Sequence, residues 1–311
     1  MDRERERTRS FGHGRDSFEP LGPECGLVTV GQPLDSPEYL KRLASLLHDR
    51  PDVTLRVHTK ASRDLEFLEY FPGLRRLSVD LWDLDDIAGL SHLQGGLELL
   101  HFGKTKKRFS LRFLDTMPAL ETLSLVGHSK DFATVGGLSR LTSFALRGIT
   151  LPDLSALTPL TGLTHFSLLL GGTTKLTQLA ALPRLEALSL MRVTRLDDLS
   201  ILAELPSLRT LSLDWMRNIT SLPSLAPLTH LEEVNLETMT GLTEIAAVAA
   251  APALRRLTIA GMPQLDAEAF RCLVGHPCLT ELVLHPSLGG VNLKKPVLAA
   301  VKQLLPDVVR P

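Results

Sequence analysis

Large aromatic rings are scarce in this chain. Phe, Trp and Tyr make up only 5% of its 311 residues, although apolar residues as a whole reach 44%. A core assembled from leucine with so few rings indicates one packing arrangement used repeatedly rather than a varied globular interior. Cysteine is scarce as well: there are three, an odd number, which argues against a disulfide framework and is typical of a reducing compartment.

The chain also lacks a strong charge of one sign and long apolar runs. Its formal net charge of −1 gives no field that would draw it to nucleic acid or to an acidic membrane surface. No stretch approaches the ~18 apolar residues of a membrane span, and residues 1–20 have no apolar segment like that of a signal peptide. We therefore expect a cytoplasmic protein with neither a nucleic-acid nor a membrane partner.

Catalytic motifs are missing too. The sequence contains no GxGxxG, Walker A, HExxH or GxSxG pattern. Cys272, His276 and Cys278 come nearest to a metal site, but the spacing of the two cysteines does not fit a zinc knuckle and no second ligand pair follows. The sequence thus predicts structural cysteines, no metal, no cofactor and no enzymatic activity.

What the chain does contain is a repeat. The pattern L-x-x-h-x-h, where h is apolar, occurs ten times, from LRRLSV at Leu74 to LTELVL at Leu279. The copies begin at Leu74, Leu97, Leu120, Leu141, Leu163, Leu185, Leu208, Leu231, Leu254 and Leu279. Apolar residues alternate with small or polar ones in each copy, which predicts a half-buried strand. Stacked copies would pair their strands into a parallel sheet over one continuous core.

The segments between these strands have a different spacing. Leucines fall at every third position from Leu196 to Leu208, which favours short 3₁₀ turns and extended chain over a long α-helix. The longest segment, 265–278, is the exception, and we expect an α-helix there that begins near Asp266.

The repeat resembles the leucine-rich-repeat family, and most closely the 22-residue type of bacterial internalin-like domains. The stretch ITLPDLSALTPLTGLTHFSL, Ile149 to Leu168, carries the likeness, which covers roughly residues 64–290. The resemblance implies an α/β solenoid: a horseshoe with a parallel sheet on its concave face, short 3₁₀ or helical segments on its convex face, and helical caps. It also implies a protein that binds other proteins.

The chain departs from that family at one position. Many members place asparagine three residues after the last strand leucine, where it bonds the backbone of the turn. The residues found there instead are Trp82, Thr105, His128, Ile149, Gly171, Val193, Met216, Met239, Met262 and Ser287. The turn backbone must therefore find its hydrogen bonds elsewhere.

The ends of the chain predict caps on the solenoid. We expect a disordered tail (1–18), an N-terminal cap (19–63), the repeats (64–290) and a C-terminal helical cap (291–311). The N-terminal cap should hold strands at 27–30 and 53–57 and a helix that begins at Ser36-Pro37, a capping side chain followed by a first-turn proline. Pro296 should open the C-terminal helix.

In the family geometry, residues that flank the buried strand positions face the concave surface. Those in the middle and later repeats give an apolar strip, two arginines and an acidic patch as the predicted partner site: Val126, Arg147, Leu169, Leu170, Met191, Arg192, Asp214, Trp215, Glu233 and Glu237. Trp, Met and Arg are enriched in interfaces. Two alternatives stay open: Leu170 and Trp215 fold over the adjacent turn and complete the core edge, or the acids merely keep the face hydrated.

One dense basic run, Lys104, Lys106, Lys107 and Arg108, could contact phosphate or an acidic partner. A solvated loop is favoured, because we expect no aromatic side chain to act as a stacking partner for the basic positions.

The leading hypothesis is a non-enzymatic scaffold that is monomeric alone and binds a protein partner on its concave face. The first alternative is a regulatory or inhibitory subunit of a single intracellular enzyme. The second is a metal-dependent or hydrolytic enzyme that uses His101, His165 and the C-terminal carboxylates.

Overall fold

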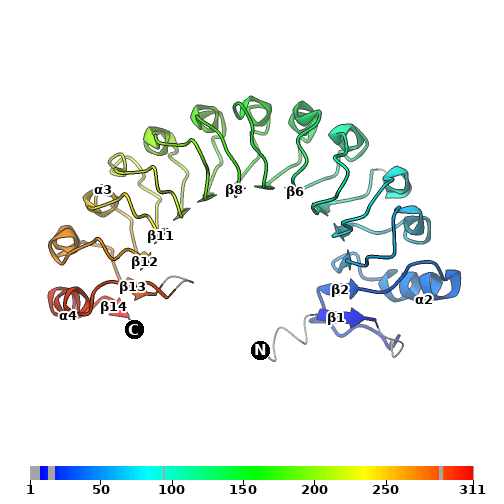
Figure 1. The fold of residues 1–311 in the computed structure, drawn as a ribbon, viewed down its shortest axis with the longest axis horizontal. Coiled ribbons are helices and arrows are strands. Elements are labelled where there is room, and N and C mark those ends of the chain that lie inside the picture. Colours follow the sequence, from blue (N-terminus) through cyan, green and yellow to red (C-terminus); the bar gives the residue numbers. More distant parts are fainter. Residues whose placement is uncertain (1–7, 13–17, 94, 287–289, 311) are drawn as a thin grey trace. The chain divides into compact units, whose positions relative to one another are not determined.

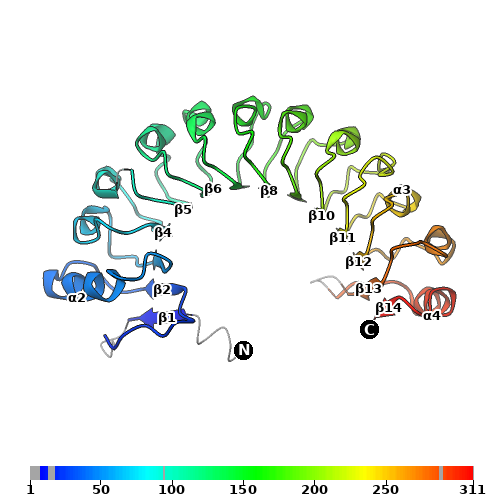
Figure 2. The same ribbon diagram turned by 180° about the vertical axis from the view of Figure 1, so that it is seen from behind.

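A computed structural model describes residues 8–12, 18–93, 95–286 and 290–310. The chain folds into two compact units, Met1–Phe144 and Ala145–Pro311. Within each unit the strands line one side of a solenoid and the short helical segments line the other (Figure 1). Figure 2 shows the same two sides from behind.

The first unit contains the N-terminal cap and the first repeats. Its elements are β1 (Thr8–Phe11), β2 (Leu27–Val30), α2 (Pro37–Leu47), β3 (Thr54–Val57), η1 (Glu66–Tyr70), β4 (Arg76–Val79), η2 (Ala88–Leu93), β5 (Leu99–Phe102), η3 (Leu111–Thr116), β6 (Thr122–Val126) and η4 (Phe132–Gly137). Strand β7 (Ser143–Arg147) contains the boundary between the units.

The second unit continues the same alternation. Its elements are η5 (Ser155–Leu157), β8 (His165–Leu169), η6 (Thr177–Ala181), β9 (Ala187–Met191), η7 (Ser200–Glu204), β10 (Thr210–Asp214), β11 (Glu233–Glu237), α3 (Ala246–Ala249), β12 (Arg256–Ala260), η8 (Glu268–Leu273), β13 (Glu281–His285), α4 (Lys295–Leu304) and β14 (Val309–Arg310).

All strand pairs within each unit are parallel and follow chain order, β1 to β6 in the first and β8 to β14 in the second. Equivalent repeat positions lie opposite each other, so that Leu211 faces Leu188 on one side and Val234 on the other. These three side chains are buried. The parallel sheet, the ten repeat strands and the period-two burial predicted from the sequence are confirmed.

The every-third leucines produce 3₁₀ hydrogen bonding, as predicted. Leu202 N donates to Leu199 O at 3.0 Å, Leu205 N donates to Leu202 O at 3.2 Å, and Leu208 N donates to Leu205 O at 3.1 Å. All four leucines are buried. The three-residue period of a 3₁₀ turn therefore places each of them on the same, core-facing side.

The α-helix predicted within 265–278 is wrong. Asp266 does begin the segment, since its Oδ1 accepts a hydrogen bond from Ala269 N at 3.0 Å, but η8 is a 3₁₀ helix. Its buried residues, Phe270 and Leu273, lie three apart, and Gly275 takes a left-handed φ of 74° soon after. Buried residues spaced three apart, with a glycine soon after them, favour a 3₁₀ helix over an α-helix.

The disorder predicted for residues 1–18 is contradicted at Thr8–Phe11, which form β1 and pair with β2. Phe11 is 3% exposed, and its ring centroid lies 5.3 Å from that of Phe18. Burial of these two rings explains why a charged stretch orders there. Residues 1–7 and 13–17 lie outside the described residues.

The other cap elements form where the sequence places them. Ser36 caps α2, its hydroxyl accepting a hydrogen bond from Tyr39 N at 3.4 Å, and Pro37 is the first helical residue. At the far end Pro296 is in the first turn of α4, and β14 pairs with β13. No helix in the described part of the chain combines the length and apolar character needed to cross a membrane.

Candidate functional site

The turns that follow the strands hold the candidate site, and they are built differently in the two units. In the first unit His128 occupies a slot where the family has asparagine, and it is only 1% exposed. Its Nε2 lies 3.1 Å from Gly103 O, and its Nδ1 accepts a hydrogen bond from Phe109 N at 3.4 Å. Burial lowers the pKa of His128, and the neutral ring with its proton on Nε2 makes both bonds.

In the second unit the equivalent slots hold buried apolar side chains, among them Val193, Met216 and Met239. Val193 N lies 3.4 Å from Met216 Sδ, to which it donates. Gln264 supplies the other bonds, since its Nε2 donates to Met239 O and to Leu242 O, both at 2.8 Å. The turn backbone, which asparagine bonds in many family members, is thus bonded by a histidine in the first unit. In the second unit a methionine thioether and a glutamine bond it.

Four of the predicted site residues lie in one row across the second unit. Leu169, Met191, Asp214 and Glu237 end β8, β9, β10 and β11 and face one another in register. All four are half-buried. We call them the strand-end row. Arg147 is exposed at the end of β7, beside this row, because the next residue, Gly148, donates from its N–H to Leu169 O at 2.9 Å.

Two other predicted residues, Val126 and Glu233, do not belong to the strand-end row. Val126 ends β6 in the first unit and is half-buried there. Glu233 begins β11, at the opposite end from Glu237, and its Oε1 accepts a hydrogen bond from Asn235 Nδ2 at 3.2 Å. The structure therefore gathers most of the apolar strip but only part of the acidic patch.

A second row follows immediately after the first. Leu170, Arg192, Trp215 and Thr238 have φ of 53°, 50°, 53° and 52°, in the left-handed region. Their N–H groups donate at 2.7–2.9 Å to Met191 O, Asp214 O, Glu237 O and Ala260 O. We call these four residues the left-handed row. Gly148 and Gly261 take the same conformation in the flanking repeats, with φ of 65° and 61°.

Left-handed backbone is unfavourable for side chains with a Cβ by roughly 1–2 kcal/mol per residue, and a β-branched residue such as Thr238 is rarely found there. Leu170, Arg192 and Trp215 were among the site residues predicted from the sequence, whereas Thr238 was not. The sequence did hold a signal for the left-handed conformation of Thr238. Gly127, Gly148 and Gly261 occupy the equivalent position in other repeats and mark it as one that prefers glycine.

Trp215 is the centre of the left-handed row. The guanidinium carbon of Arg192 lies 5.0 Å from the indole centroid and that of Arg217 lies 5.3 Å from it. These residues border a pocket of about 240 Å³ that is lined by Arg192, Val193, Thr194, Trp215, Arg217 and Asn218. Arg217 and Asn218 were missed from the sequence, because they follow the turn and not the strand.

The acids beside Trp215 are crowded. The pKa of Asp214 is raised to about 6, chiefly by burial and then by the charge of Glu237, while Arg192 and the hydrogen bond from the Trp215 N–H act to lower it. Two buried oxygens here, Asp214 Oδ1 and Thr238 Oγ1, find no hydrogen-bond partner among the described residues. A buried polar atom left unpaired is costly, so both atoms would gain from a ligand that donates to them.

In the first unit the basic run does have aromatic neighbours, which corrects the sequence-based expectation. The Lys104 ammonium lies 5.5 Å from the ring centroid of Trp82, which is 51% exposed. The Lys107 ammonium lies 5.3 Å from the ring of Phe109 and donates to Asp85 O at 2.8 Å. Trp82 was missed because it lies one repeat earlier in sequence.

The two histidines named in the enzyme hypothesis belong to different units. His101 Nε2, in the first unit, lies 3.3 Å from Asp80 Oδ1, and Arg56 Nε donates to Asp80 Oδ2 at 2.8 Å. The bonds from His101 and Arg56 lower the pKa of Asp80. His165 belongs to the second unit, where it is exposed on β8. No group of three His, Cys, Asp or Glu side chains suited to a metal ion occurs among the described residues.

His276 lies in sequence between an exposed Cys272 and a half-buried Cys278, and the structural role of these two cysteines stays a prediction. His276 Nε2 lies 3.0 Å from Ala251 O, and its Nδ1 accepts hydrogen bonds from Cys278 N and Leu279 N at 3.3 and 3.1 Å. Both ring nitrogens are therefore engaged with backbone groups.

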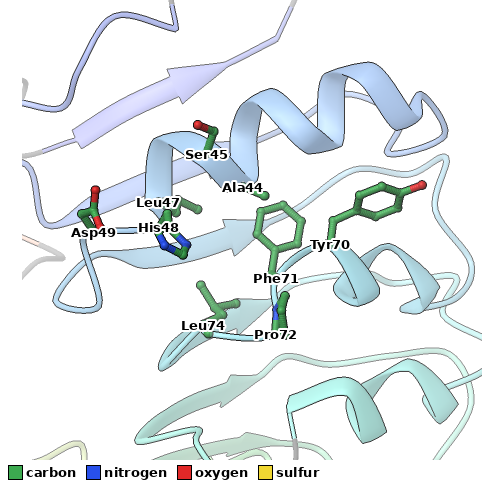
Figure 3. Close-up of a pocket in the computed structure, with 10 residues that line it drawn as sticks. Ala44, Ser45, Leu47, His48, Asp49, Tyr70, Phe71, Pro72 and Leu74 are labelled. Carbon is green, nitrogen blue, oxygen red and sulfur yellow. The ribbon is translucent and has the colours of Figure 1, made fainter.

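A separate cavity of about 470 Å³ lies in the N-terminal cap, between the end of α2 and the loop after η1 (Figure 3). Ser45, His48 and Asp49 from α2 and its end face Phe71 and Leu74 across it. Its lining mixes polar and apolar groups, and it lies on the helical side of the first unit.

No protein-family model matches the chain, and no curated protein sequence matches it. Solved structures do. An internalin (inlF) from Listeria monocytogenes is 22% identical with a TM-score of 0.60, over 91% of this chain and 78% of that one. The functional domain of InlJ from Listeria monocytogenes is 14% identical, with a TM-score of 0.51 over 83% of this chain and 57% of that one. TLR13 in its complex with ssRNA13 is 16% identical, with a TM-score of 0.51 over 89% and 44%.

Proposed function

From the premise that the chain has the leucine-rich-repeat fold of internalin type, we propose that it is a non-enzymatic scaffold for a protein partner. The proposed contact surface is the strand-end row together with the left-handed row of the second unit. Arg147 and Glu233 lie at its margins, and Val126 stays a separate prediction for the first unit.

The observation that carries this proposal is the left-handed row. In four successive repeats a side chain occupies a backbone conformation that Gly148 and Gly261 adopt without strain. Backbone strain of this kind persists where the side chain makes a contact that glycine cannot make. Such strained residues concentrate at binding sites. Leu170 is 36% exposed, so the row does not serve the core alone.

The surroundings of the row suit a protein interface. Trp and Arg are the residues most enriched in binding hot spots, and Trp215 has Arg192 and Arg217 against its ring. The outward strand positions before Leu170, Arg192 and Trp215 hold small side chains, whereas Asn235 precedes Thr238, so a partner surface could approach the sheet closely along the first three strands. The small side chains are those of Ser167, Ser189 and Ser212.

The test is partner capture from cells of the source organism, followed by mass spectrometry. A variant carrying Met191→Ala, Arg192→Ala and Trp215→Ala should recover its partner at least tenfold less well than the unchanged protein. The control carries Arg184→Ala and Glu204→Ala, two exposed positions beside η6 and in η7. Equal recovery by the triple variant and the control would overturn the proposed surface. One stoichiometric enzyme among the captured proteins would identify the scaffold as a regulatory subunit.

A further inference from the structure

The pocket beside Trp215 is bordered by two positively charged side chains, Arg192 and Arg217. Among the described residues neither Arg192 nor Arg217 forms an ion pair with a carboxylate, whereas Arg209 and Arg256 pair with Glu232 and Glu281. We propose that this pocket binds an oxyanion, a phosphoryl or carboxyl group, carried by a side chain of the protein partner. The inference deepens the proposed function and rests on it.

The arrangement of the two arginines supports this chemistry. Both guanidinium groups lie about 5 Å from the same indole centroid, so the ring holds both forks at one pocket before a ligand arrives. A guanidinium donates in a planar fork that matches carboxylate and phosphate oxygens, and stacking leaves its edge N–H groups free. The exposed amide of Asn218 lies on the same wall and adds a further donor.

The charge pattern favours a single anionic side chain over a nucleic acid. Asp214 and Glu237 lie directly beside the pocket, and Arg192 is close enough to Asp214 to affect its pKa. A phosphate backbone that crossed the pocket would run against these acids. The indole of Trp215 already contacts two guanidinium groups, so a stacking base would have to displace at least one of them.

The same neighbourhood indicates what accompanies the anion. Asp214 Oδ1 is buried without a hydrogen-bond partner and lies one residue from Trp215. It would accept a hydrogen bond from a donor next to the anionic group, such as a backbone N–H or a basic side chain. The partner segment that fits is thus a short peptide in which an acidic or phosphorylated residue neighbours such a donor.

Trp215 itself can report binding, because the chain has only two tryptophans. In a Trp82→Phe protein all tryptophan emission comes from Trp215. This protein is titrated at constant ionic strength with N-acetyl-phosphoserine amide and with N-acetyl-aspartate amide. N-acetyl-serine amide serves as the uncharged control. We expect saturable emission changes with millimolar dissociation constants for the two anions. The dissociation constant should be about tenfold lower for the anion that matches the partner's natural group. The uncharged serine compound should give no saturable change.

Variants tie the signal to the pocket. In the Trp82→Phe background, Arg192→Gln and Arg217→Gln should each raise the dissociation constant at least fivefold. Arg184→Gln, an exposed arginine outside the pocket, should leave it unchanged. Any one of three results would overturn the inference. The first is no saturable change with either anion, and the second is binding by the two pocket variants as tight as that of the Trp82→Phe protein. The third is arginine-dependent binding of oligouridylate that is tighter than that of the phosphoserine compound.

Failure of this inference differs from failure of the proposed function. If the pocket binds no anion but the scaffold proposal holds, the emission stays flat while the Met191, Arg192 and Trp215 triple variant still loses its partner. If the scaffold proposal fails, the triple variant captures partners as well as its control does, whatever the anion titration shows.

Discussion

The two units satisfy the backbone hydrogen bonds of their turns in different ways. In the first unit a buried histidine, His128, reaches under the turn and bonds Gly103 O and Phe109 N. In the second unit buried methionines fill that space, and the backbone bonds run from the left-handed row to the next strand. A histidine ring thus bonds the turn backbone at His128 in the first unit, whereas in the second unit Gln264, the Met216 sulfur and strand carbonyls share this role.

The difference also reverses the response to acid. Burial lowers the pKa of His128 in the first unit, whereas burial and then the charge of Glu237 raise that of Asp214 to about 6 in the second. As the pH falls below 6.5, the unfolded histidine gains a proton that the folded one resists, so the first unit loses stability. As the pH falls through 6 toward 3.8, folded Asp214 binds protons more readily than unfolded Asp214, so the second unit gains stability.

The largest expected effect comes from removing the histidine. His128→Ala leaves Gly103 O and Phe109 N unpaired and opens a cavity beside Phe102, whose ring lies 4.6 Å from that of His128. We expect the free energy of unfolding to fall by about 3 kcal/mol in urea titrations. Faster hydrogen exchange should be confined to the first unit. His165→Ala, at an exposed position, is the control, and a loss below about 1 kcal/mol in the His128 variant would contradict this account.

The second unit has its own dependence on one polar side chain. Gln264→Ala removes the hydrogen bonds to Met239 O and Leu242 O, and should cost about 2 kcal/mol of unfolding free energy. Hydrogen exchange should then speed up around β11 and β12. Gln303→Ala, exposed in α4, should change stability little. Equal effects of the two substitutions would mean that the methionine-filled turns do not need Gln264.

The opposite acid responses make a smaller but sharper test. Asp214→Asn should raise the free energy of unfolding by roughly 1 kcal/mol at pH 7.5, discounted for a half-buried group, and by almost nothing at pH 4. Thermal unfolding at the two pH values measures this difference. In the unchanged protein, hydrogen exchange corrected for intrinsic rates should show the first unit weakening and the second strengthening between pH 7 and pH 5. The same sign of change in both units would refute the assignment.

The sequence predicts the repeat strands and the 3₁₀ turns because each follows from a local period, two residues in the strands and three in the turns. It does not predict β1, because the strand depends on pairing with β2 and on the contact of Phe11 with Phe18, and both require the folded cap. Likewise the pairing of Lys104 with Trp82 joins two repeats and has no local signature. The left-handed conformation of Thr238 is visible only when its column is compared across repeats.

We propose that the left-handed row is kept for binding and not for the fold. Leu170→Gly, Arg192→Gly, Trp215→Gly and Thr238→Gly combined would test it most directly, with Gly148→Ala as the reverse control. No atom outside the neighbouring residues lies within 4 Å of a Cβ at Gly148, so alanine there should cost about 1 kcal/mol through strain alone.

For the four-glycine protein, both the unfolding free energy and partner capture are measured. Relief of roughly 1 kcal/mol of strain per residue should offset the lost side-chain contacts. The account therefore predicts stability within about 1 kcal/mol of the unchanged protein and at least a tenfold loss of capture. A fall in stability of more than about 3 kcal/mol, or undiminished capture, would contradict it.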